Sequence, residues 1–140
     1  SASQEKLKQK YSSIDKIDVK LPIVVDSKFI EQKTGNFYEG LEKILNGLYE
    51  IALQDKKTRA GKGKRRGRPY RKTAGMLLVL GNKEKIKIKG IEVRQAGSLQ
   101  VSDLASNGAR LVVYTEQAVK DIEERIKGKQ KKETGKWWSQ

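Results

Sequence analysis

The chain has 140 residues, no cysteine, no histidine and a formal net charge of +14 at pH 7. This length suffices for one domain with a buried core, and the missing residue types exclude disulfides, thiolate zinc sites, a cysteine nucleophile, and the commonest general base and metal ligand. No apolar run approaches the ~20 residues of a membrane span and the polar N-terminus has no signal-peptide pattern, so we expect a soluble intracellular protein without metal or cofactor.

Residues 1–30 predict one short helix, one strand and a turn. The polar N-terminal stretch has sparse apolar positions that suit a short helix around Gln4 to Tyr11. The run Leu21–Val25 is apolar and β-branched, which is typical of a buried strand. Pro22 suits the beginning of that strand, where its missing N–H is tolerated. Ser27 is expected to cap a short turn that runs to Ile30.

Residues 36–55 predict a helix in two pieces. Asn36 is the expected N-cap, because Glu39 three residues later completes a capping-box pattern. Apolar residues then follow on one helical face, namely Phe37, Tyr38, Leu41, Ile44, Leu45 and Leu48. Gly47 is expected to break the helix, and a second piece would occupy residues 48–55.

Four strands are expected between residues 76 and 114. Met76–Leu80 is a continuous apolar run, which is typical of a central parallel strand buried on both faces. Lys85–Lys89 alternates with period two and by itself predicts an edge strand. Ile91–Val93 and Leu111–Tyr114 predict two further strands.

The C-terminal part predicts a single turn, a helix and a tail. Ser102 is expected to cap a turn that runs to Ala105. Thr115 is expected to cap a helix that begins with Glu116, and its predicted buried stripe consists of Val119, Ile122 and Ile126. Beyond the helix, residues 127–140 are rich in lysine and glycine and cannot build a core, so we expect a basic flexible tail.

Alternation of strands and helices at this spacing indicates an α/β fold. We predict a small three-layer domain over residues 1–126, with a parallel sheet of about four strands and crossover helices. A basic arm at residues 56–75 lies within the domain, and the tail follows it.

The positive charge is concentrated rather than spread. Residues 56–72 hold ten bases and no acid, and residues 127–140 carry a net charge of +4. Residues 1–55 and 73–126 carry net charges of only −1 and +1. A chain that was basic for solubility would distribute the excess over its surface. The pattern therefore indicates a polyanionic partner.

Residues 58–72 have the side chains that bind phosphates. Arginine pairs with two phosphate oxygens at once, and the interleaved glycines let the backbone approach a surface closely. Tyr70 could stack on an exposed base. The predicted RNA-binding residues are Arg59, Lys62, Gly63, Lys64, Arg65, Arg66, Gly67, Arg68, Tyr70, Arg71 and Lys72. We expect the arm to be mobile alone and to become ordered on RNA.

Two other interpretations of the arm fit less well. A solvated loop or a nuclear-localisation-like run explains many basic heptamers, but this segment is internal, acid-free and interleaved with glycines. A Walker nucleotide loop needs four residues between its glycines, whereas Gly61 and Gly67 are separated by five and Arg68 follows. We therefore reject the nucleotide loop.

The arm resembles a known family. The run Arg59–Lys64 (RAGKGK), then Arg66–Arg68 (RGR), Tyr70 and Gly75 before an apolar strand are similar to archaeal and eukaryotic forms of the fourth protein of the large ribosomal subunit. The resemblance covers roughly residues 20–126 and includes Leu21–Val25, Gly90–Val93, Ser98–Ala105 and Ala109–Ala118. In that family the segment corresponding to Lys83–Lys89 is a short helix, so the resemblance favours a helix there over a strand.

The resemblance implies a non-enzymatic protein of the ribosome in the cytoplasm, with large-subunit rRNA and neighbouring ribosomal proteins as partners. Family members carry a further N-terminal portion, with a long basic extension that reaches the polypeptide exit tunnel. The chain has no match to that portion, so it is either a fragment or a form without the extension. Pro69 stands where the family often has a basic residue.

The tail contains further candidate binding residues. Lys131, Lys132, Trp137 and Trp138 are candidate anchors in an rRNA pocket or on a neighbouring protein, although the paired indoles fit a cloning idiosyncrasy equally well.

Two other functions compete with a ribosomal role. One is an α/β nucleotide-binding enzyme, for which Gly81-Asn82 is the only candidate loop. The other is a non-ribosomal RNA-binding or ribosome-assembly factor, which shares the chemistry of the arm.

Overall fold

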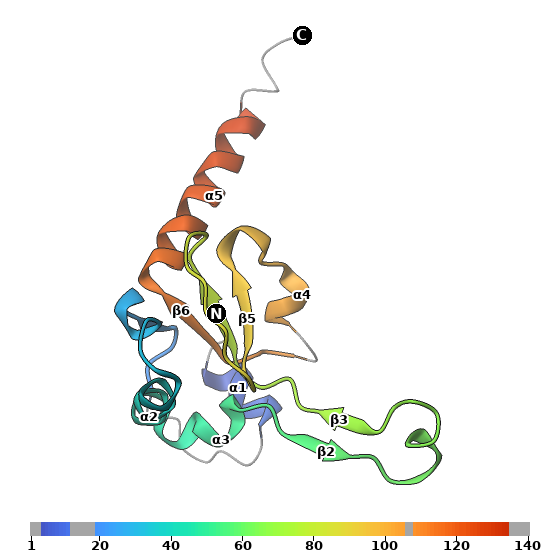
Figure 1. Cartoon of the computed structure of the whole chain (residues 1–140). Helices are drawn as coiled ribbons and strands as arrows, with labels where there is room; N and C mark the ends of the chain where they lie inside the picture. The colour runs from blue at the N-terminus through green and yellow to red at the C-terminus, as the bar shows by residue number, and fades with distance from the viewer. Residues whose placement is uncertain (1–3, 12–18, 106–107, 135–140) are drawn as a thin grey trace.

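The computed structural model describes residues 4–11, 19–105 and 108–134 (Figure 1). Its centre is a parallel sheet of four strands in the order β1-β6-β4-β5. The strands are β1 (Ile23–Val25), β4 (Leu77–Leu80), β5 (Glu92–Gln95) and β6 (Val112–Thr115). The small three-layer α/β domain predicted from the sequence is confirmed.

Three helices cover one face of the sheet. They are α1 (Gln4–Lys10), α2 (Thr34–Leu45) and α3 (Tyr49–Ala52). Their apolar side chains pack against one set of alternate strand residues; this core contains Leu7, Phe37, Leu41, Leu45, Leu78, Leu80 and Val113. The expected short N-terminal helix and the helix in two pieces are thereby confirmed.

The opposite face carries α4 (Val101–Leu104) and α5 (Glu116–Thr134). Here Leu77, Val79 and Val112 pack with Ala96 and Ala118. Every residue of β4 is therefore buried, with successive side chains entering different cores. This explains why its sequence is continuously apolar rather than alternating.

Several predicted helix boundaries were wrong. Helix α2 begins at Thr34, where the N-cap is Lys33 without a side-chain hydrogen bond, so Asn36 lies inside the first turn. The N–H of Phe37 therefore donates to the Lys33 carbonyl (3.0 Å) within the helix, and Phe37 shares the buried face with Leu41 and Leu45 as predicted. The helix ends as expected near residue 47, but the residue with positive φ is Asn46 (45°) and not Gly47.

Two of the three other predicted caps were also misplaced. Asp26 accepts a hydrogen bond from the Lys28 N–H and caps the turn that was assigned to Ser27. Gln100, rather than Ser102, caps α4 in a capping box with Asp103. The third cap is confirmed, since Thr115 Oγ1 accepts the Ala118 N–H (3.1 Å) at the beginning of α5.

Residues 85–89 form neither the edge strand that their period-two alternation predicts nor the helix that the family resemblance favours. Ile86 and Ile88 are half-buried against the α2-side core while Lys85, Lys87 and Lys89 are exposed. The alternation therefore reflects real one-sided burial. In the described parts of the chain, residues 85–89 pair with no strand, because β5 already occupies the edge beside β4.

Helix α5 differs from its predicted form in its buried face and in its length. Val119 is 41% exposed and Ile126 is 55% exposed, whereas Ala118 is buried and Ile122 is half-buried. The small Ala118 side chain allows close approach to the sheet, which turns Val119 and Ile126 outward. The helix continues to Thr134, so residues 127–134 of the predicted tail are helical. Trp137 and Trp138 lie outside the described residues.

Glu84 ties the carboxyl ends of β4 and β6 together. Its carboxylate accepts hydrogen bonds from the Gly81 N–H (2.7 Å) and the Thr115 hydroxyl (2.7 Å). Burial acts to raise the pKa of Glu84, but the nearby Ser27 hydroxyl and the hydrogen bonds from Thr115 and Gly81 outweigh burial and hold the pKa below its ordinary value of 4.5. The folded state therefore favours the ionised form.

This lowered pKa predicts an acid-dependent loss of stability. A carboxyl group with a depressed folded pKa stabilises the fold above its unfolded pKa, and this contribution disappears as the pH falls through the folded pKa. We expect Glu84→Gln to flatten the decline of the unfolding free energy below about pH 4.5, measured by urea unfolding at stepped pH. Parallel curves for wild type and Glu84→Gln would contradict the assignment, and Glu124→Gln, at an exposed position within α5, serves as the control.

Candidate nucleic-acid interface

The basic arm is a β-hairpin that projects from the domain (Figure 1). Strand β2 (Lys56–Thr58) pairs antiparallel with β3 (Tyr70–Lys72), so that Lys57 lies opposite Arg71 and Thr58 opposite Tyr70. Every residue of both strands is exposed. The hairpin thus holds a row of cations away from the core.

Backbone hydrogen bonds close the tip of the arm. A 3-10 turn spans Gly61–Gly63, and the N–H groups of Arg66 and Arg68 donate back to Gly63 (3.3 and 3.1 Å). Gly61 and Gly67 have positive φ values of 79° and 72°. The backbone conformation alone requires glycine at these two positions. The space around each is open, so a side chain would meet no neighbouring atom.

The predicted phosphate-binding side chains lie on this one hairpin. All the lysines and arginines among them are exposed; they are Arg59, Lys62, Lys64, Arg65, Arg66, Arg68, Arg71 and Lys72. The sequence places no acid between Lys56 and Lys72. Asp55, which pairs with Lys57 (3.1 Å), stands just outside that stretch. The positive field of the arm is consequently almost uncompensated.

Arg59 and Tyr70 have contacts that the sequence did not reveal. Arg59 bridges the hairpin, because its N–H donates to the Pro69 carbonyl (2.8 Å) and its Nε to the Tyr70 carbonyl (3.2 Å). Tyr70 is half exposed and lies under Lys56, whose Nζ is 3.8 Å from the ring centroid. Arg59 therefore shapes the arm as well as adding charge.

The described part of the tail belongs to a helix at another end of the domain. Lys131 and Lys132 belong to the last turns of α5, which begins at the carboxyl end of β6, whereas the arm leads into the amino end of β4. Figure 1 shows α5 and the arm projecting from different ends of the domain.

The described residues contain no group of three or more acidic side chains placed to hold a metal ion. Across the same parts of the chain, no helix has the length and apolar character needed to cross a membrane.

Comparison with known proteins gives the family. No family model matches the chain. The large ribosomal subunit protein uL4 of Methanocaldococcus jannaschii is 38% identical over 117 residues, which cover 76% of this chain and 46% of that protein. The matched part of the chain belongs to the uL4 family. The uL4 proteins of Saccharolobus islandicus (37% over 123 residues; 79% and 45% covered) and Haloquadratum walsbyi (37% over 117 residues; 77% and 46%) are similar to it as well.

The chain spans about half the length of the uL4 proteins that it matches. The resemblance first inferred from the arm thus extends over 76–79% of the chain. Each relative bears the name of a ribosomal protein.

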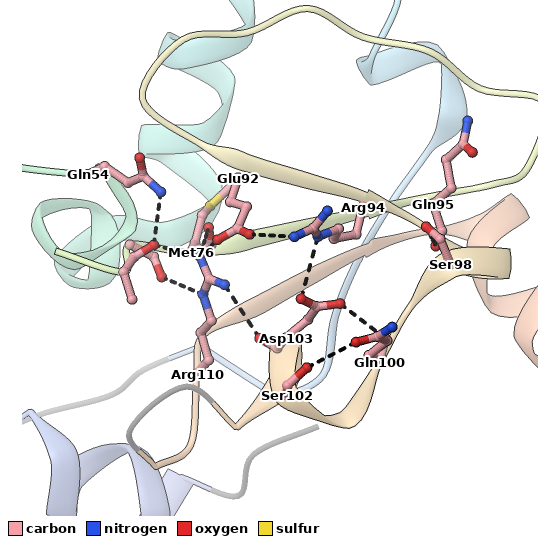
Figure 2. Close-up of polar contacts among 12 residues, drawn as sticks. Gln54, Met76, Glu92, Arg94, Gln95, Ser98, Gln100, Ser102, Asp103 and Arg110 are labelled. Atoms are coloured by element: carbon pink, nitrogen blue, oxygen red, sulfur yellow. Dashed lines mark hydrogen bonds and ion pairs between the residues drawn. The ribbon is translucent and has the colours of Figure 1, made fainter. Parts of the chain in front are cut away.

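The base of the arm contains residues that sequence reasoning missed as functional candidates (Figure 2). Arg110 and Gln54 both donate hydrogen bonds to the Ala74 carbonyl, where the arm returns to the sheet. Gly75 follows with a positive φ of 63° and with the Ala52 carbonyl only 3.0 Å from where a Cβ would stand. Arg110 and Gly75 lay within the motifs that resembled the uL4 family, but neither spacing nor composition assigned them a role.

Proposed function

We propose that the chain is a non-enzymatic constituent of the large ribosomal subunit that binds large-subunit rRNA through the arm. The observation that carries this proposal is the exposed hairpin with ten bases and no acid within residues 56–72. Phosphate contacts of this kind position a protein on RNA without reading its sequence. The uL4 relatives support the large subunit as the location.

The contacts at the end of β4 argue against a nucleotide-binding enzyme. A phosphate loop there would need free backbone N–H groups after the strand. Instead the Gly81 N–H donates to Glu84 and the Asn82 N–H donates to Asp121 (both 2.7 Å). A phosphate would meet two carboxylates at this position, so the fold supports no nucleotide site there.

Sedimentation tests the proposal. Extract from cells that make the chain is run on sucrose gradients at low and high salt, and fractions are probed for the chain. An integral subunit protein is expected to co-migrate with large subunits after a salt wash. A chain that stays at the top of the gradient would overturn the ribosomal assignment. Release by moderate salt would indicate a free RNA-binding or assembly factor instead.

A further inference from the structure

We propose that Arg110 is a positioning residue that sets the direction of the arm and thereby the number of phosphates it reaches. The inference rests on the proposed function and deepens it. Arg110 lies just before β6, is only 2% exposed, and places its guanidinium against the chain segment by which the hairpin returns to the sheet (Figure 2). It contributes nothing to the exposed charge of the arm itself.

The guanidinium holds three successive carbonyls at the returning end of the arm. Its Nε donates to Gly75 (3.0 Å), and its Nη2 donates to Ala74 (2.5 Å) and Met76 (3.3 Å). A lysine ammonium is a compact point charge and cannot reproduce this planar fork. Arg110 therefore fixes the path of the chain as it leaves β3 for β4.

The same guanidinium is held in turn by the domain. Glu92 of β5 pairs with Nη2 (2.8 Å), and the Asp103 carbonyl of α4 accepts from Nη1 (3.4 Å). Arg94 links Glu92 (3.3 Å) to the Asp103 carboxylate (3.5 Å), which closes the network. The arm base is thus connected to β5 and α4 through one buried charge.

Two further hydrogen bonds hold the base of the arm. Gln54 Nε2 donates to the Ala74 carbonyl (3.2 Å), and the Thr73 N–H donates to Asp55 (3.1 Å). The hydrogen bonds of the tip are local, within residues 59–70. The base of the arm is therefore tied to the domain, whereas the tip is held only by hydrogen bonds of its own exposed turn, which refines the expectation of an arm that is mobile throughout.

Rotation at the base would displace the distant tip most. An arm of variable direction would hold fewer phosphates at once and would lose more entropy on binding, because preorganised contacts cost less to order. A purely structural Arg110 would affect stability alone. The two roles can be separated by the salt dependence of binding, since the slope of log K against log salt counts phosphate contacts.

The decisive variant is Arg110→Lys, which preserves net charge. Binding to deproteinised archaeal large-subunit rRNA is measured by filter retention at several salt concentrations. We expect about tenfold weaker binding near 100 mM salt and a slope smaller by about one, equivalent to one lost phosphate contact. Ile122→Ala, which removes packing under α5 on the other face of the sheet, is the control for lost stability and should keep both values.

Hydrogen exchange supplies a second readout. In the wild type without RNA, the amides of Thr73 and Met76 should be protected and those of residues 64–68 should exchange. Arg110→Lys should lose protection at the two base amides beyond its loss of global stability. Should Arg110→Lys fail to fold, Gln54→Met, which removes only the donor to Ala74, is expected to weaken binding and reduce the slope in the same sense.

The outcomes separate a failure of the positioning role of Arg110 from a failure of rRNA binding. If the wild type and Ile122→Ala bind rRNA, and Arg110→Lys (or Gln54→Met in its place) binds equally well with the same salt slope, the positioning role is wrong and the RNA-binding function stands. If the wild type itself does not bind, the proposed function fails and the inference fails with it.

Discussion

Neutralising the arm will lower the affinity for large-subunit rRNA by at least about 10³-fold near 100 mM salt. The variant replaces six exposed cations with glutamine; they are Lys62, Lys64, Arg65, Arg66, Arg68 and Arg71. Each cation that neutralises a phosphate releases counterions, so six lost contacts should also reduce the salt slope by about four to five. Arg59 is left in place because its side chain bridges the hairpin. Filter binding across a salt series provides both values.

The control must change net charge equally at another place. Six exposed lysines outside the arm serve this purpose, namely Lys43, Lys83, Lys85, Lys87, Lys89 and Lys120. Replacing them with glutamine should reduce affinity far less, because the arm would still present its phosphate contacts. Equal losses in the two variants would mean that overall charge attracts the RNA and that the arm has no special role.

The sheet could be predicted because burial on two faces requires a recognisable composition. Met76–Leu80 is continuously apolar since its side chains enter two cores. Ile23–Val25 consists of β-branched residues, and three of the four residues of Val112–Thr115 are β-branched, which is typical of strands. The hairpin of the arm was not predicted. Its strands are exposed on both faces, so they show no apolar alternation, and only the cations and glycines marked the segment as special.

The errors have a common physical origin in tertiary contacts. Residues 85–89 alternate because one side covers the core, and the sequence does not reveal whether a neighbouring strand is available for pairing. The buried face of α5 depends on close approach at Ala118, a residue too small to count in an apolar stripe. Arg110 lies 34 to 36 residues along the chain from the carbonyls that it binds, so local pattern gives no signal for it.

A core substitution should separate folding from binding. Phe37 is fully buried, with its ring 4.9 Å from that of Phe29 and 5.8 Å from that of Tyr38. Phe37→Ala removes this packing and leaves a cavity, so we expect the free energy of unfolding to fall by about 3–5 kcal/mol, measured by urea unfolding. Phe37→Leu, which keeps most of the volume, should cost much less.

The RNA affinity of folded Phe37→Ala is expected to match that of the wild type. Helix α2 lies away from the arm, and the contacts of the arm base come from α3, β5, α4 and the segment before β6 (Figure 1). The comparison is made at a temperature where circular dichroism shows both proteins folded. A loss of affinity under those conditions would mean that the α2-side core also sets the arm, and that Arg110 does not fix its direction alone.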